Sequence, residues 1–263
     1  MRHKRSRLDA ILKAIEHGPT DVEGLAARFD VSSSTIRRDL QNLSARQAIA
    51  RTYGGAMLVA PERETNLTAR TTQNRAAKTA IAEAALARIA EGETLILDGG
   101  STVAALGQRL RGRRQKVITN NLPLVPSLGG APGMELVVLG GTLRPLSMST
   151  TGPLAEQALR TMSADKIFTS ADGAVPGRGL CEATLEQVSL KGLMLSQAAQ
   201  VFLLLDASKL GRAGQPFWAP FRPGWTLVTD ANEAACAPFR DVGLHVIRVG
   251  GEARDKPLRG AAS

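Results

Sequence analysis

The chain has 263 residues, 43% of them hydrophobic, and carries 33 Lys and Arg against 24 Asp and Glu, a formal net charge of +9. This length allows one large domain or a small domain followed by a large one, and the apolar fraction is typical of a globular protein. Residues 1–60 contain 10 basic and 6 acidic side chains, so the basic excess is densest at the N-terminal end. A basic segment of this kind favours a polyanionic partner.

The rare residue types and the hydropathy pattern exclude several classes of protein. Cys181 and Cys236 form no motif, which indicates reduced thiols in a cytoplasmic protein rather than a disulfide scaffold. The three histidines, His3, His17 and His245, are scattered without metal-ligand spacing, so we expect neither a metal site nor a cofactor. No apolar run follows the basic N-terminus as in a signal peptide, and no stretch reaches the ~20 apolar residues of a membrane span. We therefore expect a cytoplasmic protein that does not enter membranes.

Three amphipathic helices are predicted in the first 45 residues. The first covers Arg7–Glu16 and ends before Gly18-Pro19, the second begins after a capping Thr20 or Asp21, and the third covers Ser32–Ala45. Apolar side chains at helical spacing provide each helix with one buried face. Three short helices joined by tight turns are typical of a helix–turn–helix unit.

The third helix combines an N-cap, an apolar stripe and a polar face. Ser32 is a good N-cap, because its hydroxyl can accept an orphan amide proton of the first turn. Ile36, Leu40 and Leu43 repeat at helical spacing and therefore form one buried stripe. The other face offers hydroxyl and guanidinium groups, which grip phosphates and read base edges in the major groove. They belong to Ser33, Ser34, Thr35, Arg37 and Arg38.

A short hairpin is predicted directly after this helix. Two apolar runs, 48–53 and 56–59, flank Gly54-Gly55, which is typical of the wing of a winged helix. Arg51 and Tyr53 then lie where a wing contacts the DNA backbone or the minor groove. The same helices also fit a solvated protein-interaction bundle, because an arginine pair on a helix is often plain surface. The capped polar face, the hairpin and the basic excess together favour DNA binding.

After this winged helix–turn–helix domain over 1–60, the chain alternates short apolar runs with helical stretches. A polar linker is expected at 61–70, a helix from about Thr72 to Ala90, and a loose tail at 252–263. Continuous apolar runs separated by helices predict a mostly parallel sheet covered on both faces, and hence an α/β Rossmann-like domain over 71–251. The runs are Thr94–Leu97, Lys116–Thr119, Leu136–Leu139, Lys166–Thr169, Val201–Leu205, Leu227–Thr229 and His245–Val249.

Polar loops follow five of these runs, at the sheet edge where ligands bind in parallel α/β folds. Gly99–Thr102 opens a helix, so its bare amides and hydroxyls predict an anion site suited to a phosphate. Carboxylate and amide side chains at the other strand ends suit sugar hydroxyls, and a nearby Lys or Arg would pair with the phosphate. The candidate effector-binding residues are Asp98, Gly99, Gly100, Ser101, Thr102, Asn120, Asn121, Gly141, Arg144, Asp172, Lys191 and Lys209.

Simpler explanations exist for parts of this pattern. Gly and Asp end strands in most α/β proteins for turn reasons alone. Lys191 lies in the apolar helical stretch Val188–Leu195, from which its side chain would extend to solvent. The convergence of five polar loops on one sheet edge favours a binding site over these explanations.

The segment 4–58 resembles the DNA-binding domain of the DeoR family of bacterial transcriptional regulators. The strings Val31-Ser32, Thr35–Leu40 and Gly54-Gly55-Ala56 carry this resemblance. The family usually has His before the Gly-Gly-Ala, where this chain has Tyr53, whose hydroxyl still offers a donor to a phosphate. The resemblance implies a transcription factor whose third helix enters the major groove of operator DNA, with its arginine pair on phosphates or bases.

The larger domain is similar to the C-terminal sensor domain of the same family, so the resemblance covers nearly the whole chain. The family usually has Gly-Thr-Thr where this chain has Gly100-Ser101-Thr102, a change that keeps the hydroxyl. The resemblance implies that a phosphorylated sugar or related metabolite is the effector and relieves repression of a carbohydrate-use operon. The similar strings are Val117–Asn121, Leu139–Gly141, Gly152, Asp165–Phe168 and Asp206–Gly211.

That sensor domain is itself similar to ribose-5-phosphate isomerase, which supplies the alternative of an isomerase fused to a DNA-binding domain. The isomerase loop reads Asp-Gly-Ala-Asp-Glu, but here Asp172-Gly173-Ala174 precedes Val175-Pro176, which cannot act as a general base. Glu182 is a substitute only if the fold brings it there. We therefore expect a repressor rather than an enzyme. It should bind DNA as a homodimer or homotetramer, because one small domain makes too few contacts for a specific site.

Overall fold

The computed structural model describes residues 20–45, 49–52, 55–58 and 65–250, together with residues 8, 10, 11 and 14. The chain divides into two compact units, one made mainly of residues 1–63 and the other mainly of residues 64–212 and 217–263. Among the described residues, no helix is long and apolar enough to cross a membrane. The same residues contain no group of three or more His, Cys, Asp or Glu arranged to hold a metal ion.

The N-terminal unit is built on helices α2 (Val22–Phe29) and α3 (Ser33–Ala45). The side chain of Asp21 caps α2 by accepting from the amide of Gly24. Asp30 then ends α2 in the left-handed conformation, with φ of 48°, and turns the chain toward α3. These observations match the helix–turn–helix predicted from the sequence. One apolar core joins the helices, and its members include Leu8, Ile11, Val22, Leu25, Ile36, Leu40 and Leu43.

The predicted hairpin is present as strands β2 (Ile49–Thr52) and β3 (Gly55–Leu58), which pair antiparallel. A third strand, β1 (Thr20–Asp21), pairs with the other edge of β3. The sequence did not indicate β1, because a two-residue strand has no periodicity of its own. Tyr53, the linker residues 61–64 and the tail 252–263 lie outside the described residues.

The second unit contains a seven-stranded sheet, and all its neighbouring strands run parallel. The α/β class expected from the sequence is therefore confirmed, and each predicted apolar run falls on one strand. In sheet order the strands are β15 (His245–Arg248), β14 (Thr226–Thr229), β12 (Ala198–Leu204), β9 (Ala164–Thr169), β4 (Thr94–Leu97), β5 (Gln115–Thr119) and β6 (Met134–Val138).

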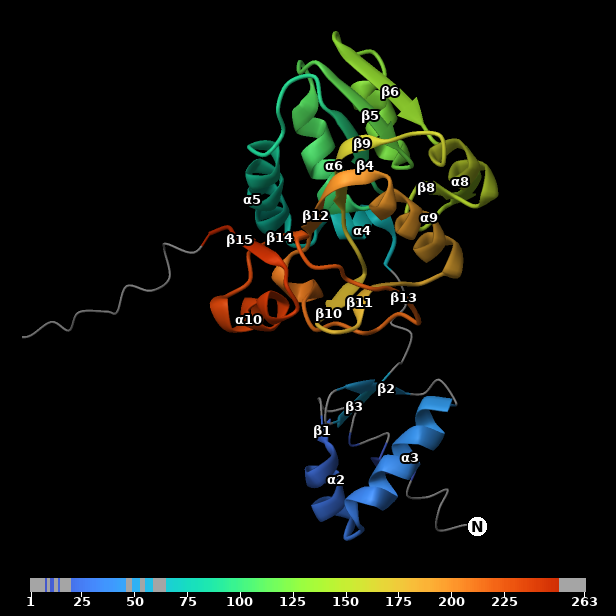
Figure 1. The fold of residues 1–263 in the computed structure, drawn as a ribbon, viewed down its shortest axis with the longest axis vertical. Coiled ribbons are helices and arrows are strands. Elements are labelled where there is room, and N and C mark those ends of the chain that lie inside the picture. Colours follow the sequence, from blue (N-terminus) through green and yellow to red (C-terminus); the bar gives the residue numbers. More distant parts are fainter. Residues whose placement is uncertain are drawn as a thin grey trace, which may run out of the picture. The chain divides into compact units, whose positions relative to one another are not determined.

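Helices cover both faces of this sheet (Figure 1). On one face, α5 (Arg75–Leu86) and α6 (Ser101–Gly107) pack in a core with Leu95 and Leu97 of β4. Ile96, between those two leucines, belongs to the core on the opposite face, because side chains alternate along a strand. That second core is covered by α8 (Pro153–Leu159), α9 (Leu185–Ser196) and α10 (Glu233–Asp241).

Short elements complete the second unit. Strands β7 (Thr142–Arg144) and β8 (Ser149–Thr151) form an antiparallel hairpin. A separate antiparallel sheet has the order β10 (Gly173–Val175), β11 (Gly179–Glu182), β13 (Phe217–Ala219). Four one-turn helices among the described residues connect larger elements: η1 (Gln108–Leu110), η2 (Leu122–Leu124), α7 (Val125–Leu128) and η3 (Ala207–Lys209).

The structure differs from the expected linker at 61–70, because α4 spans Leu67–Thr72. Asn66 caps this helix by accepting from the amide of Ala69 at 2.9 Å. The Leu67 side chain is buried, and its amide donates to the carbonyl of Leu146 at 2.8 Å. Asn74 adopts a left-handed conformation that separates α4 from α5, so the helix expected from about Thr72 to Ala90 covers only Arg75–Leu86.

Candidate functional site

The start of α3 carries a connected group of hydroxyls. The amide of Thr35 donates to Oγ of Ser32 at 3.2 Å, so Ser32 caps the helix as predicted. The same Oγ lies 2.9 Å from both Oγ of Ser34 and Oγ1 of Thr35. These contacts hold small polar groups together where the helix presents its free amides.

Beyond this cap, α3 separates its apolar and basic faces. Ile36 and Leu40 are fully buried, whereas Arg37 and Arg38 are exposed. Two adjacent guanidinium groups therefore reach solvent from a helix that is anchored on its other side. Arg51 lies in β2, where only the backbone is described.

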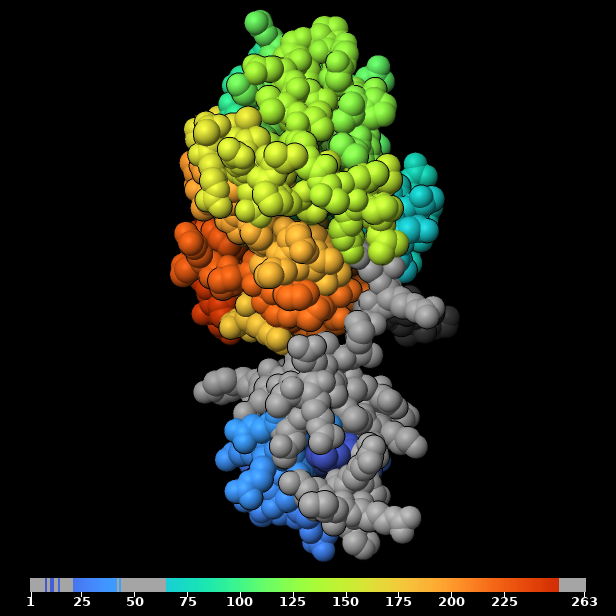
Figure 2. Space-filling view, turned by 90° about the vertical axis from the view of Figure 1, so that its right-hand side faces the viewer, coloured from blue at the N-terminus to red at the C-terminus, as the bar shows by residue number. Residues whose placement is uncertain are grey.

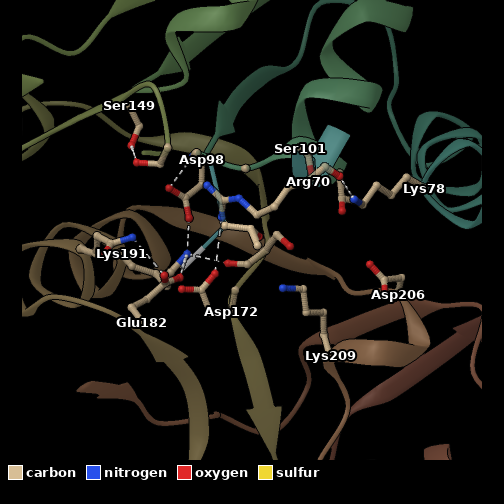
Figure 3. A pocket seen from close by; sticks show the side chains of 18 of the residues that line it. Arg70, Lys78, Asp98, Ser101, Ser149, Asp172, Glu182, Lys191, Asp206 and Lys209 are labelled. Atoms are coloured by element: carbon tan, nitrogen blue, oxygen red, sulfur yellow. Dashed lines mark hydrogen bonds and ion pairs between the residues drawn. The ribbon is translucent and has the colours of Figure 1, made fainter. Parts of the chain in front are cut away.

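The second unit holds a cavity of about 250 Å³ at the carboxyl ends of the parallel strands. Residues that follow β4, β5, β9 and β12 line it, and α4, α5, α9, β11 and the β7–β8 hairpin contribute further side chains. Figure 3 shows charged side chains from these separate elements facing one another across the cavity.

Lys191 of α9 is buried at one end of the cavity and does not extend to solvent. Its Nζ donates to Oγ1 of Thr169 at 2.8 Å and forms ion pairs with the carboxylates of Asp98 and, at 3.2 Å, Glu182. It also donates to the carbonyl of Ser170 at 2.7 Å. The sequence-based alternative of a solvent-exposed lysine is therefore wrong, because the helix turns this face toward buried carboxylates.

Burial and neighbouring charges shift the pKa values of Glu182 and Lys191 in this cluster. Burial raises the pKa of the Glu182 carboxyl to about 8, and the carboxylates of Asp172 and Asp98 add to this increase, while Lys191 opposes it. Burial favours the neutral amine of Lys191, but the carboxylates of Asp98 and Glu182 outweigh it and raise its pKa above the ordinary value. Glu182 therefore binds a proton more readily than an exposed carboxyl does, while Lys191 stays charged.

Arg70 of α4 links the cavity wall to a neighbouring loop. Its Nη1 forms an ion pair with Oδ1 of Asp172 at 3.4 Å, and its Nη2 donates to the carbonyl of Leu146 at 3.3 Å. Arg70 was not among the predicted site residues, because it falls in the segment expected to be a polar linker.

Lys78 and Lys209 lie at the other end of the cavity, away from Lys191 (Figure 3). Nζ of Lys78 donates to carbonyls at the end of α4, including that of Gln73 at 2.7 Å, and burial lowers its pKa. Lys209 is half-buried and forms no ion pair with any residue in the described part of the chain. Between them, the carboxylate of Asp206 accepts from Nδ2 of Asn74 at 2.9 Å.

The two asparagines after β5 have different positions. Nδ2 of Asn121 donates to the carbonyls of Asp98 and Gly100, each at 3.1 Å, so this side chain holds the loop after β4 in shape. Asn120 lines the cavity, and its Nδ2 donates to the carbonyl of Thr150 at 3.1 Å. Its Oδ1 is buried and has no hydrogen-bond partner among the described residues, so it offers an acceptor to a ligand.

Nine of the twelve residues proposed from sequence line this cavity, and three do not. Asn121 supports the loop behind it, and Arg144 donates to Oγ of Ser147 at 3.2 Å instead. Gly141 has φ of 126°, and a Cβ there would lie 2.4 Å from the carbonyl oxygen of Thr151. Glycine at this position therefore allows the two backbone segments to approach each other closely. The lining side chains that were not among the effector-binding candidates include Arg70, Asn74, Lys78, Ser149, Glu182, Gln187, Asp206 and Ser208. Glu182, named above only as a possible base, is therefore brought to the cavity by the fold.

Comparison with known families matches both units. Residues 7–62 match the DeoR-like helix-turn-helix domain, and residues 73–231 match the DeoR C terminal sensor domain. The chain belongs to the DeoR family. The HTH-type transcriptional regulator GolR of Listeria innocua is 33% identical over 86% of this chain and 90% of its own length. The lactose phosphotransferase system repressor of Lactococcus lactis is 31% identical over 87% of this chain and 91% of its own.

Family membership makes the chain a DNA-binding transcriptional regulator rather than an enzyme, as the sequence predicted. The alternative of an isomerase is not favoured. Ribose 5-phosphate isomerase A from Methanocaldococcus jannaschii is 19% identical, with a TM-score of 0.38 over 52% of this chain and 55% of that one. This likeness is too distant to carry a functional argument.

Proposed function

We propose that this DeoR regulator represses a carbohydrate-use operon and is controlled by a phosphorylated sugar or related metabolite in the cavity. The names of related proteins support a carbohydrate-use operon as the target. They include the lactose phosphotransferase system repressor and, at 31% identity over 79% of this chain, a putative aga operon transcriptional repressor of Escherichia coli. The chemistry of the cavity supports the class of effector.

The observation that carries this proposal is the division of the cavity into two chemical ends. Around Lys191, the carboxylates of Asp98, Asp172 and Glu182 and the free Oδ1 of Asn120 suit the hydroxyls of a sugar. At the other end, Lys209 has no carboxylate partner in the described part of the chain, so its charge is available to an anion. A ligand with hydroxyls at one end and an anionic group at the other matches both ends of the cavity.

The anion is proposed to lie between Lys209 and the loop Gly99–Thr102. Ser101 and Thr102 line the cavity and offer hydroxyl donors, which complement a phosphate together with the lysine. Ligand pockets usually measure about 300–1,000 Å³. The volume of about 250 Å³ therefore favours a monosaccharide phosphate over a larger nucleotide.

For the DNA-binding unit, we propose that α3 enters the major groove. Arg37 and Arg38 would hold phosphates or base edges, while Ser33 and Thr35 fix the register. Ser32, as the cap, Arg51 and Tyr53, in the wing, are further candidates for contact. The protein would act as a homo-oligomer, dimer or tetramer, on repeated half-sites, in the cytoplasm where bacterial operator DNA lies.

Thermal-shift measurement with a panel of sugar phosphates tests the effector proposal. A sugar phosphate that binds the folded state should raise the unfolding temperature, whereas the same sugar without phosphate should not. The effector should also weaken a gel shift on DNA upstream of the gene, because a ligand switches a protein only by binding its two states unequally.

The triple substitution Ser101→Ala/Thr102→Ala/Lys209→Ala should remove most of this stabilisation. Arg160→Ala is a suitable control, because it deletes an exposed cation outside the cavity. Unchanged stabilisation in the triple variant would show that the phosphate site is elsewhere, and a panel without any stabilising ligand would contradict the effector class.

A further inference from the structure

Large exposed hydrophobic side chains concentrate in one part of the sensor unit. The described residues include seven such side chains, and five of them fall within residues 138–154. Their exposed fractions run from 40% for Val138 to 68% for Leu154. Exposed apolar groups that gather in this way mark interaction surfaces more often than single ones do. The five are Val138, Leu143, Leu146, Met148 and Leu154.

One of these side chains, Val138, lies on a free edge of the main sheet, and the other four follow it in the β7–β8 hairpin, its turn and the start of α8. Strand β6 is the last strand in the sheet order, and no strand among the described residues pairs with its outer edge. Figure 1 shows β6 at one side of the sheet, and in Figure 2 the yellow-green atoms of the segment from β6 to α8 form one continuous surface.

The backbone of β6 offers unused hydrogen-bonding groups at that edge. The amide of Leu139 donates to the carbonyl of Thr119 in β5 at 2.8 Å. Because successive residues of a strand direct their backbone groups to opposite sides, those of Leu136 and Val138 point away from β5. A free edge of this kind is a template for pairing with another strand.

The hairpin that follows β6 along the chain has a turn whose backbone is held in place by neighbouring segments. Met148 has φ of 48°, a left-handed conformation that is uncommon for a residue other than glycine. Its carbonyl accepts from the amide of Leu122 at 3.1 Å, and the carbonyl of Leu146 accepts from the amide of Leu67 at 2.8 Å. The surrounding structure thus maintains a strained backbone that presents apolar groups to solvent.

This segment of the chain carries little charge. Residues 134–154 contain one acidic residue, Glu135, and one basic residue, Arg144, in a chain whose formal net charge is +9. Glu135 is itself paired with Lys116 of β5 at 2.9 Å. A nucleic acid or an acidic protein would gain no attraction here. Two positively charged copies of the chain, however, would meet with least repulsion at this neutral surface.

We propose that residues 134–154 form the face through which two copies of this chain associate, with β6 pairing antiparallel to β6 of the second copy. A strand edge paired about a two-fold axis is complementary to itself, so it needs no second kind of surface. Leu143, Leu146 and Met148 then cover the junction. This proposal rests on the homo-oligomer proposed above and assigns its interface.

The same hairpin is also a wall of the effector cavity. Ser147 and Ser149 line the cavity, and the carbonyl of Leu146 accepts from Nη2 of Arg70 at 3.3 Å. Arg70 in turn pairs with Asp172. A ligand that rearranges these contacts therefore acts on the association face directly.

Sedimentation velocity of the full chain tests the interface. The wild type should sediment as a dimer or larger, and Leu143→Glu/Leu146→Glu should reduce its mass to half or less at the same concentration, because four carboxylates would be buried in each pair. Phe217→Glu is the matched control, since it places a charge at an exposed apolar residue of another sheet. Far-ultraviolet circular dichroism checks that each variant is folded.

A second variant keeps the test decisive if the double substitution does not fold. Val138→Cys, treated with a short bis-maleimide, should give a covalent dimer, whereas Phe217→Cys should not. If the wild type is a monomer at all concentrations, both the oligomer and this interface are overturned. If the wild type is an oligomer, but Leu143→Glu/Leu146→Glu leaves its mass unchanged and Val138→Cys gives no covalent dimer, only the interface is overturned.

Discussion

The recognition helix and the effector cavity position polar side chains in opposite ways. In α3, the hydroxyls of Ser32 and Thr35 and the guanidinium groups of Arg37 and Arg38 come from one short run of sequence and face solvent. In the cavity, buried Asp98 and Lys191 are 93 positions apart in the chain yet form an ion pair.

This difference determines how the stability of each region responds when a charged side chain is removed. An exposed helix face loses little folding free energy when a charge is removed, because water already solvates it. A buried ion pair that loses one partner leaves an uncompensated charge inside the protein. Substitutions in the exposed face of α3 should therefore change function without changing stability. Substitutions of the buried charges in the cavity should change both.

The largest effect is expected from Lys191→Met, which deprives Asp98 of its cation. Breaking a buried pair usually costs about 3–5 kcal/mol of unfolding free energy. Urea unfolding followed by tryptophan fluorescence measures this loss in the sensor unit alone, because both tryptophans, Trp218 and Trp225, belong to that unit.

Lys116→Met is the control for that measurement, since it removes a lysine from an ion pair whose side chains are 43% and 66% exposed. Such exposed pairs contribute about 0–1 kcal/mol. Equal losses in the two variants would contradict the structural role assigned to Lys191.

An effect on binding without an effect on stability is expected from Arg37→Ala/Arg38→Ala. Losing two groups that contact phosphates or bases should weaken operator binding by about 100-fold, because a good base contact is worth about 1–3 kcal/mol. Fluorescence anisotropy with labelled operator DNA at several salt concentrations measures the loss. If each arginine neutralises one phosphate, the salt slope should fall by about 2.

Arg111→Ala/Arg114→Ala removes the same charge from an exposed turn of the sensor unit and should leave operator binding nearly unchanged. A similar loss of affinity in both double variants would assign the effect to net charge. Recognition by α3 would then be rejected.

A pH dependence of stability is expected to arise from Glu182. Its pKa is raised to about 8 in the folded protein, from an ordinary value of 4.5. The folded state therefore binds a proton that the unfolded state releases, which stabilises the protein fully below pH 4.5. This stabilisation is lost as the pH rises through about 8. Glu182→Gln should flatten the fall in unfolding temperature between pH 6 and 9.

Glu135→Gln, at an exposed ion pair, should keep the wild-type pH profile and serves as the control. Tryptophan fluorescence melts at closely spaced pH values are sufficient. Parallel profiles for wild type and Glu182→Gln would assign the titration to another group.

Local features of the sequence determined both domain types and much of the candidate site. Ile36, Leu40 and the capping Ser32 lie within one helix, so their spacing alone predicts a helix with a polar face. The parallel strands are continuous apolar runs because they are buried on both faces. Asp98 and Asn120 could be proposed because they directly follow such runs.

Only the tertiary structure decided which distant residues share the cavity and which strand is left at an edge. Arg70 and Lys78 come from helices, and Glu182 from a small sheet, whose places depend on packing across the whole unit. Local hydropathy pointed Lys191 toward solvent, yet two buried carboxylates hold it inside. The strand order that leaves the outer edge of β6 without a partner among the described residues is likewise a long-range property, because the sequence of a strand does not specify its neighbours.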